Sequence, residues 1–188
     1  MTGLPVAWKV ETAKDSELPL VPVLLDVVKQ RGFTVDVCVM DRGYDAEVIY
    51  EQVESRHIRP VVPLRQTPAV KACKHKPPTC DHGEWTFAGS DPKRGASKWR
   101  CPTGECKPAS VWVKANRLHP LIPRETDRFK ALYHQQGAVE REFGTLKHQW
   151  ALLPLRVRRL ERVRVHVDLT ILTQLGSTLV SAVEAHAA

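Results

Sequence analysis

Residues 34–45, with the sequence TVDVCVMDRGYD, combine a β-branched run with a turn. The run Thr34–Met40 favours a strand of mixed polarity. Asp45 is a good N-cap for a helix over Ala46–Arg56, and Arg59–Leu64 predicts a second strand. This order of strand, helix and strand is typical of an α/β domain.

Asp41 directly follows the first of these strands. Open α/β sheets bind their ligands at the carboxyl ends of their strands, so Asp41 is a candidate site residue. Gly43 would let the backbone turn tightly beside it. From the residues alone, an aspartate in an ordinary strand-to-helix turn remains the alternative.

The residues before this unit predict a further strand and a helix. The alternation in Leu4–Val10 indicates a short strand. A helix is predicted over Leu20–Gln30, with Ser16 as its cap and Gly32 as its stop. Because the first strand has no lead-in sequence, we expect the chain to begin inside a domain.

The segment after residue 64 differs in composition and charge. Arg65–Pro123 is rich in Pro, Lys, Gly and Cys, with short β-like pieces at Glu84–Phe87 and Ser110–Val113. Arg65–Lys130 holds 14 Lys and Arg against 6 Asp and Glu, a net charge of +8, whereas the whole chain carries +7. Such a field favours a polyanionic partner. We expect core residues at 1–64, a basic β- and loop-rich insertion at 65–125, and C-terminal helices at 126–188.

Two long helices are predicted after the insertion. On a helix over Arg128–Trp150, Tyr133, Glu140 and Lys147 are seven residues apart and share one face, as does Gln136. An adjoining apolar stripe would dock this helix on a sheet; it consists of Val139, Phe143, Leu146 and Trp150. A surface helix with solvated charges is the alternative. A final helix over Leu160–Ala185 carries an apolar stripe typical of core packing.

These motifs together resemble a known family. Asp-Arg-Gly-Tyr-Asp after an apolar strand, then Tyr133, Glu140 and Lys147 about a hundred residues later, resembles the insertion-sequence DDE transposases. Gln136 stands where that family usually has Arg, and it supplies no charge and no bidentate fork. The resemblance covers essentially the whole chain. It implies a ribonuclease-H-like mixed sheet with flanking helices, interrupted by the insertion.

The resemblance also implies a metal-dependent reaction on DNA. Three carboxylates hold two divalent ions, Mg²⁺ or Mn²⁺, for cleavage and strand transfer at transposon ends. By resemblance, Asp41 and Glu140 are the second and third carboxylates. Tyr133, Gln136 and Lys147 would contact DNA phosphates near the reacting bond. Glu142 is a rival for the third carboxylate, but it points to another side of the helix.

In the family, the first Asp lies on a strand upstream of the stretch at which this sequence begins. The chain is therefore expected to be an N-terminally truncated copy with incomplete metal binding and impaired cleavage. A non-catalytic DNA-binding protein derived from a transposase is the alternative. A zinc-stabilised module without a nucleic-acid role is a third reading.

The insertion holds four of the five cysteines, with His75 and His82 nearby. A structural zinc site would explain how a segment with so little apolar content keeps its shape. Its candidate ligands are Cys73, Cys80, Cys101 and Cys106. The alternative is four unconnected thiols. Cys38, within the first predicted strand, is expected to be a small core residue.

Basic residues surround Trp99 in the insertion. Lys93, Arg94, Lys98 and Arg100 suit DNA phosphates, and Trp99 suits base stacking. A solvated loop is the alternative for this group.

The most apolar stretch, Leu169–Val180, is too short and too polar to span a bilayer. No secretory signal is recognisable at the start of the sequence. We expect a bacterial cytoplasmic protein, associated with the nucleoid when bound to DNA, and a homodimer by resemblance.

Overall fold

The computed structural model describes residues 4–66 and 77–187. The chain forms two compact units, one of Met1–Arg31 with Gly137–Ala188 and the other of Gly32–Gln136. The three segments 1–64, 65–125 and 126–188 defined from the sequence stay a prediction.

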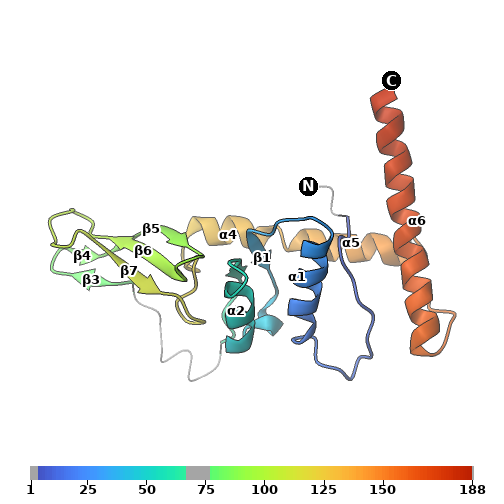
Figure 1. The fold of residues 1–188 in the computed structure, drawn as a ribbon, viewed down its shortest axis with the longest axis horizontal. Helices are drawn as coiled ribbons and strands as arrows, with labels where there is room; N and C mark the ends of the chain where they lie inside the picture. Colours follow the sequence, from blue (N-terminus) through green and yellow to red (C-terminus); the bar gives the residue numbers. More distant parts are fainter. Residues whose placement is uncertain (1–3, 67–76, 188) are drawn as a thin grey trace. The chain divides into compact units, whose positions relative to one another are not determined.

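The core of the unit Gly32–Gln136 is a parallel strand pair joined by a helix (Figure 1). Strand β1 (Val37–Val39) pairs with β2 (Arg59–Val61), with Val39 opposite Val61. Between them run the short 3-10 helix η1 (Arg42–Tyr44) and α2 (Glu47–Glu54). The predicted strand–helix–strand order and the mixed α/β class are confirmed, although both strands are shorter than predicted. A ribonuclease-H-like sheet remains a prediction.

Apolar residues from distant parts of the sequence cover this strand pair. Val61 lies in a buried cluster with Ile122 and Phe129. Residues Ile49 and Val53 of α2 have no exposed surface. The buried face of α2 thus holds the helix against the sheet, as its apolar spacing predicts.

The insertion forms two small antiparallel sheets. The hairpin of β3 (Thr79–Cys80) and β4 (Gly83–Glu84) is separate from the sheet of β5 (Thr86–Asp91), β6 (Ala96–Arg100) and β7 (Ser110–Lys114). The β-like piece predicted at Ser110–Val113 is a strand, whereas the piece at Glu84–Phe87 is divided at Trp85 between β4 and β5. Their core is a second apolar cluster, built around Trp85, Trp99 and Cys101.

The single helix predicted over Arg128–Trp150 is wrong. Helix α4 (Asp127–His134) ends in a turn at residues 135–136, and α5 begins at Gly137 and ends at His148. The backbone N–H groups of Gln135 and Gln136 bond to the carbonyl groups three residues earlier, so the end of α4 tightens to 3-10 geometry. Gly137, a weak helix former, follows this turn.

The N-terminal prediction is correct in part. Helix α1 (Leu20–Gln30) has the predicted bounds, but its N-cap is Pro19 and not Ser16. Residues 4–10 form no strand. Their contacts are irregular instead: the Trp8 indole nitrogen donates to Asp168 at 2.7 Å.

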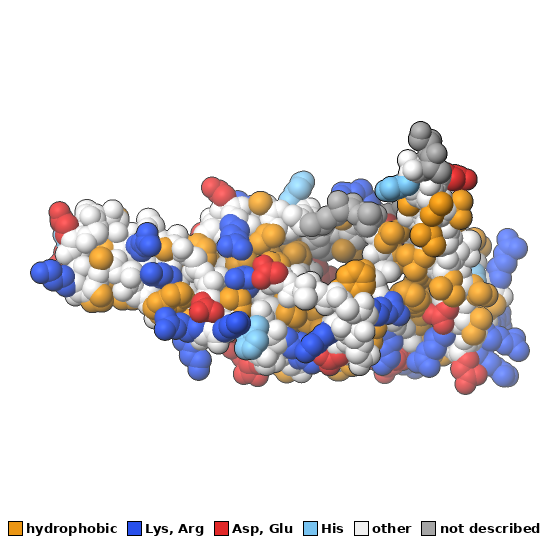
Figure 2. Space-filling model, turned by 45° about the horizontal axis from the view of Figure 1, so that its top comes forward, with side chains coloured by type: hydrophobic (Ala, Val, Ile, Leu, Met, Phe, Trp, Pro, Cys, Tyr) orange, Lys and Arg blue, Asp and Glu red, His pale blue; other side chains and the backbone are white. Residues whose placement is uncertain are grey.

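Helix α6 (Leu160–Ala187) is only partly the core helix that was predicted. Ile171 is buried, whereas Leu179 and Val183 are more than half exposed. Apolar side chains gather along this helix in Figure 2. Within the described residues, no helix is both long and apolar enough to cross a membrane.

Candidate functional site

Asp41 lies at the carboxyl end of the parallel strand pair. The Met40 N–H donates to the Val61 carbonyl at 3.1 Å, and the chain leaves the sheet at the next residue. Asp41 is exposed, and its Oδ1 accepts the Gly43 N–H at 2.6 Å, which caps η1. The carboxylate is thus held at the strand end by a backbone contact and remains accessible to solvent.

Gly43 leaves room for this contact. A Cβ atom at position 43 would lie 2.8 Å from Asp41 Oδ1, closer than carbon and oxygen approach in ordinary packing. The backbone of Gly43 does not need the left-handed region. Glycine therefore suits this position because it has no Cβ atom to displace the Asp41 carboxylate.

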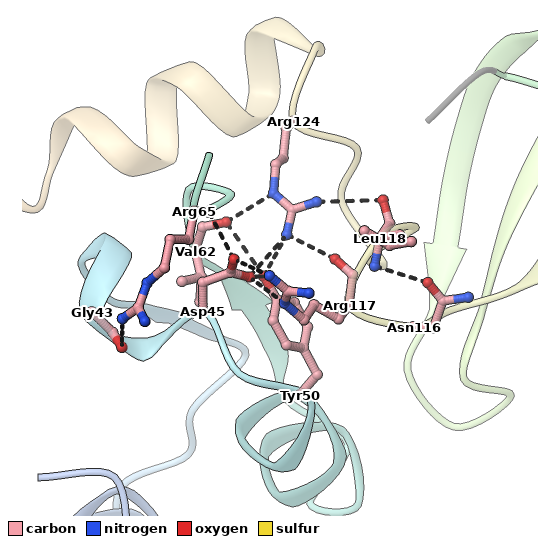
Figure 3. Close-up of polar contacts among 9 residues, drawn as sticks. All are labelled: Gly43, Asp45, Tyr50, Val62, Arg65, Asn116, Arg117, Leu118 and Arg124. Carbon is pink, nitrogen blue, oxygen red and sulfur yellow. Dashed lines mark hydrogen bonds and ion pairs between the residues drawn. The ribbon is translucent and has the colours of Figure 1, made fainter. Parts of the chain in front are cut away.

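Asp45 does not cap α2, contrary to the prediction; the N-cap is Ala46. The Asp45 side chain is fully buried and forms a bidentate ion pair with Arg117 (Figure 3). Arg117 Nε lies 3.0 Å from Oδ1, and Nη2 lies 2.7 Å from Oδ2. Oδ2 also accepts the Arg65 N–H at 2.7 Å. These contacts hold the carboxylate inward, away from the N-terminus of α2.

Arg124 extends the same network to the strand pair. It donates to the carbonyl groups of Val62 at 3.0 Å and Arg117 at 2.8 Å, and to the Tyr50 hydroxyl at 2.5 Å. Burial raises the pKa of Tyr50 to about 12, so its hydroxyl stays protonated at neutral pH. The network ties the loop before α4 to α2 and β2.

This buried network lies next to the turn that follows Asp41. Arg65 donates from Nη2 to the Gly43 carbonyl at 3.1 Å, while its backbone N–H binds Asp45 (Figure 3). Sequence reasoning missed the network because Arg117 lies 72 residues from Asp45 and belongs to no local pattern. Three arginines in the described chain thus support the turn that carries the candidate carboxylate.

Glu140 and Lys147 lie on α5, seven residues apart and both exposed. Two helical turns separate them, so they share one face as predicted. Glu142 accepts a hydrogen bond from the side chain of Gln174, which is buried on α6. That contact occupies Glu142 and leaves Glu140 as the freer carboxylate of the pair.

The predicted face of four residues does not lie on one helix. Tyr133 belongs to α4, where it is half-buried and stacks on Phe129 with ring centroids 6.1 Å apart. Gln136 lies in the turn before α5. The predicted docking stripe is also wrong in part, because Val139 and Phe143 are more than half exposed and only Leu146 is buried. Asp41 and Tyr133 belong to one compact unit, Glu140 and Lys147 to the other.

The exposed aromatic residue beside the predicted basic residues is Trp112, not Trp99. Trp99 is buried in the apolar cluster, and its indole N–H donates to Ser97. Trp112 pairs with Lys98 across β6 and β7 and is 41% exposed. The Arg94 guanidinium lies 4.7 Å and the Lys98 ammonium 5.8 Å from the centre of its ring. Lys93 and Arg100 are exposed on the same sheet and its β5–β6 turn.

Three of the four predicted zinc ligands lie together. Ligand atoms of Cys80, Cys101 and Cys106 fall within 4.8 Å of one another, and His82 joins them. Cys73 and His75 lie outside the described residues. The hydrogen bond from Thr103 lowers the pKa of Cys101 to about 5, whereas contacts with Cys80 and Cys101 raise that of Cys106 to about 12.

Comparison with known proteins gives one family. The family model described as "Transposase DDE domain" matches residues 1–174. No curated protein and no solved structure matches the chain significantly. The matched residues include Asp41 and Glu140, and they span both compact units.

Proposed function

Because the chain belongs to the family of transposase DDE domains, we propose that it acts in metal-dependent DNA cleavage and strand transfer at transposon ends. The observation that carries this proposal is the family match over residues 1–174, which includes both candidate carboxylates. The family's ribonuclease-H-like core is the fold we propose around them.

Asp41 and Glu140 would be two of the family's three metal ligands, for Mg²⁺ or Mn²⁺. The ion would polarise the scissile phosphate and activate the attacking oxygen. Exposed carboxylates suit these ions, which prefer oxygen ligands and complete their shell with water and phosphate oxygens. Two observations support this assignment: Asp41 is held at a strand end by the N–H of Gly43, and Glu142 is hydrogen-bonded to Gln174.

Lys147, Tyr133 and Gln136 would position DNA phosphates around the reacting bond. Lys147 shares the exposed face of Glu140 and supplies the positive charge. Tyr133 and Gln136 supply hydrogen bonds only. In this proposal the protein works on DNA in the bacterial cytoplasm, as a homodimer.

The surface around Trp112 favours a second function, DNA binding without catalysis. Two cations, Arg94 and Lys98, lie over an exposed indole ring, in a segment with a net positive charge. Stacking and phosphate contacts of this kind need no metal. A transposase-derived DNA-binding protein would need this surface but would not need the carboxylates of Asp41 and Glu140.

Mn²⁺ binding separates the two functions. We would titrate Mn²⁺ into the wild-type chain and the Asp41→Asn, Glu140→Gln and Glu142→Gln variants, following free Mn²⁺ by electron paramagnetic resonance. If Asp41 and Glu140 are ligands, their variants lose affinity at least tenfold and Glu142→Gln matches the wild type. Equal affinity in all four proteins would rule out the assignment.

DNA nicking and DNA binding complete this test. Nicking of supercoiled plasmid with Mg²⁺ or Mn²⁺ should be absent from the first two variants and retained by Glu142→Gln. DNA binding that persists without metal binding or nicking in any protein would favour the non-catalytic function.

A further inference from the structure

We propose that Cys80, His82, Cys101 and Cys106 form a structural Zn²⁺ site. The site is independent of the proposed function. His82 replaces Cys73 of the sequence prediction as the fourth ligand. Three thiolates and one imidazole are a ligand set typical of closed structural zinc sites. Such soft ligands favour Zn²⁺ over Mg²⁺, so this site differs chemically from the carboxylate site.

Four of the six distances between ligand atoms are close to those of a tetrahedron around one ion, and all six are within 4.8 Å. Zn–S bonds of about 2.3 Å and Zn–N bonds of about 2.0 Å imply ligand atoms roughly 3.5–3.8 Å apart at the tetrahedral angle. Cys80 Sγ and Cys101 Sγ are 3.8 Å apart. His82 Nδ1 lies 3.5 Å from Cys106 Sγ, 3.9 Å from Cys101 Sγ and 4.0 Å from Cys80 Sγ.

A disulfide does not account for this cluster. A disulfide places its two sulfur atoms about 2.05 Å apart, far closer than those of Cys80 and Cys101. All three cysteines are free thiols. Three thiols and one imidazole nitrogen from two chain segments approach one another, which is geometry that suits a shared ion.

Glu105 orients the histidine for this role. Its Oε2 lies 3.1 Å from His82 Nε2, the ring nitrogen that faces away from the sulfur atoms. A carboxylate at Nε2 favours the proton on that nitrogen, which leaves the Nδ1 lone pair for a metal. Carboxylate–histidine–metal contacts of this kind fix the ring and strengthen the ligand.

The site would join the two sheets of the insertion. Cys80 and His82 come from the β3–β4 hairpin, whereas Cys101 and Cys106 flank the loop after β6. Each strand of the hairpin has only two residues, and an isolated hairpin is marginally stable at best. Cys80 and Cys106 also pack against the cluster of Trp85 and Trp99. The ion would therefore anchor the hairpin to the β5–β7 sheet.

Metal content and cobalt spectroscopy test the proposal. The full chain, purified under reducing conditions with Zn²⁺ in the medium, should carry one zinc per chain by elemental analysis. After exchange to Co²⁺, the visible d–d bands should be those of a tetrahedral ion, and the sulfur-to-cobalt charge transfer should correspond to three thiolates. A chain that takes up neither ion after reconstitution, or an octahedral cobalt spectrum, would overturn the proposal.

Variants separate His82 from Cys73. Cys73→Ser and Cys38→Ser should each retain one zinc, whereas Cys101→Ser and His82→Ala should lose it. His82→Cys should retain the ion and add a fourth thiolate to the cobalt spectrum, which covers the case in which His82→Ala fails to fold. Glu105→Gln should weaken zinc affinity about tenfold or more. Loss of zinc from Cys73→Ser with retention by His82→Ala would overturn the assignment of His82.

Discussion

Arg117 binds both carboxylate oxygen atoms of Asp45, with Nε 3.0 Å from Oδ1 and Nη2 2.7 Å from Oδ2. The Asp45 side chain has no exposed surface, and that of Arg117 is 22% exposed. Removal of Arg117 would leave a buried carboxylate that keeps only its weaker contacts. We expect Arg117→Ala to lower the free energy of unfolding by about 3 kcal/mol, measured by urea denaturation at neutral pH.

Arg128→Ala is the matched control for this change. Arg128 is an exposed residue of α4, so its removal should alter the free energy of unfolding by no more than about 0.5 kcal/mol. Equal stabilities of the two variants would show that the ion pair does not hold the fold.

Glu54 should make stability depend on pH. It lies in a pocket with Glu47, Tyr50 and Lys114, and its Oε1 is buried without a hydrogen-bond partner among the described residues. Burial, and secondly the charge of Glu47, raise the pKa of Glu54 from 4.5 to about 7. A carboxyl group whose pKa is higher in the folded state contributes its full stabilisation of the fold at pH values below its unfolded-state pKa. That contribution is lost as the pH rises from about 4.5 to about 7.

The Glu54→Gln variant removes this titration. Its free energy of unfolding, relative to that of the wild type, should rise by about 1–2 kcal/mol between roughly pH 5 and pH 8, allowing for solvent screening. Glu47→Gln should reproduce a smaller part of the effect, because it removes the secondary cause. Denaturation curves at several pH values measure both differences. A difference between Glu54→Gln and wild type that stays constant with pH would contradict the assignment.

The elements that sequence predicts best are those fixed by local forces. Helix α1 has the predicted bounds because its apolar spacing and the stop at Gly32 are local signals. The prediction of one helix over Arg128–Trp150 is wrong because the spacing of apolar residues contains no signal for the tightened turn at residues 135–136. Spacing alone therefore placed Tyr133 and Glu140 on one helix, which the structure divides.

Contacts between distant residues explain the other differences. Asp45 has the residue type and position of a helix cap, yet its partner Arg117 lies 72 residues away. His82 lies beside Cys80 in the sequence, but only the approach of Cys101 and Cys106 distinguishes it from the other histidines. Trp99 and Trp112 both lie near basic residues, and strand register alone decides which is buried.

The Trp112 surface makes a salt-dependent prediction. If Arg94 and Lys98 each neutralise a phosphate of single-stranded DNA, replacing either with Ala should reduce the slope of log affinity against log salt by about 0.7. Trp112→Ala should weaken binding to single-stranded DNA by about 1–3 kcal/mol through lost stacking. Fluorescence anisotropy of a labelled oligonucleotide at several NaCl concentrations measures both quantities.

Lys130→Ala is the control for these variants. Lys130 is an exposed residue of α4 that pairs with Asp127, away from the β5–β7 sheet in sequence and in secondary structure. Its replacement should leave the salt slope and the stacking contribution unchanged. If Lys130→Ala and Arg94→Ala change the salt slope of DNA binding equally, the net positive charge of the chain attracts DNA and the Trp112 surface has no specific part in binding.

Gly43 offers the most specific test of how Asp41 is positioned. A methyl group at residue 43 would lie 2.8 Å from Asp41 Oδ1, so the carboxylate must move and lose its 2.6 Å bond to the Gly43 N–H. We expect Gly43→Ala to lower the free energy of unfolding by only about 1 kcal/mol, the usual cost of a lost cap. Mn²⁺ affinity should fall severalfold, because the ligand is displaced while its charge is kept. Gly176→Ala on α6, where no atom would contact the new methyl group, should raise stability slightly and leave Mn²⁺ affinity unchanged. Unchanged Mn²⁺ affinity in a folded Gly43→Ala protein would mean that the orientation of Asp41 at the end of β1 is irrelevant to metal binding.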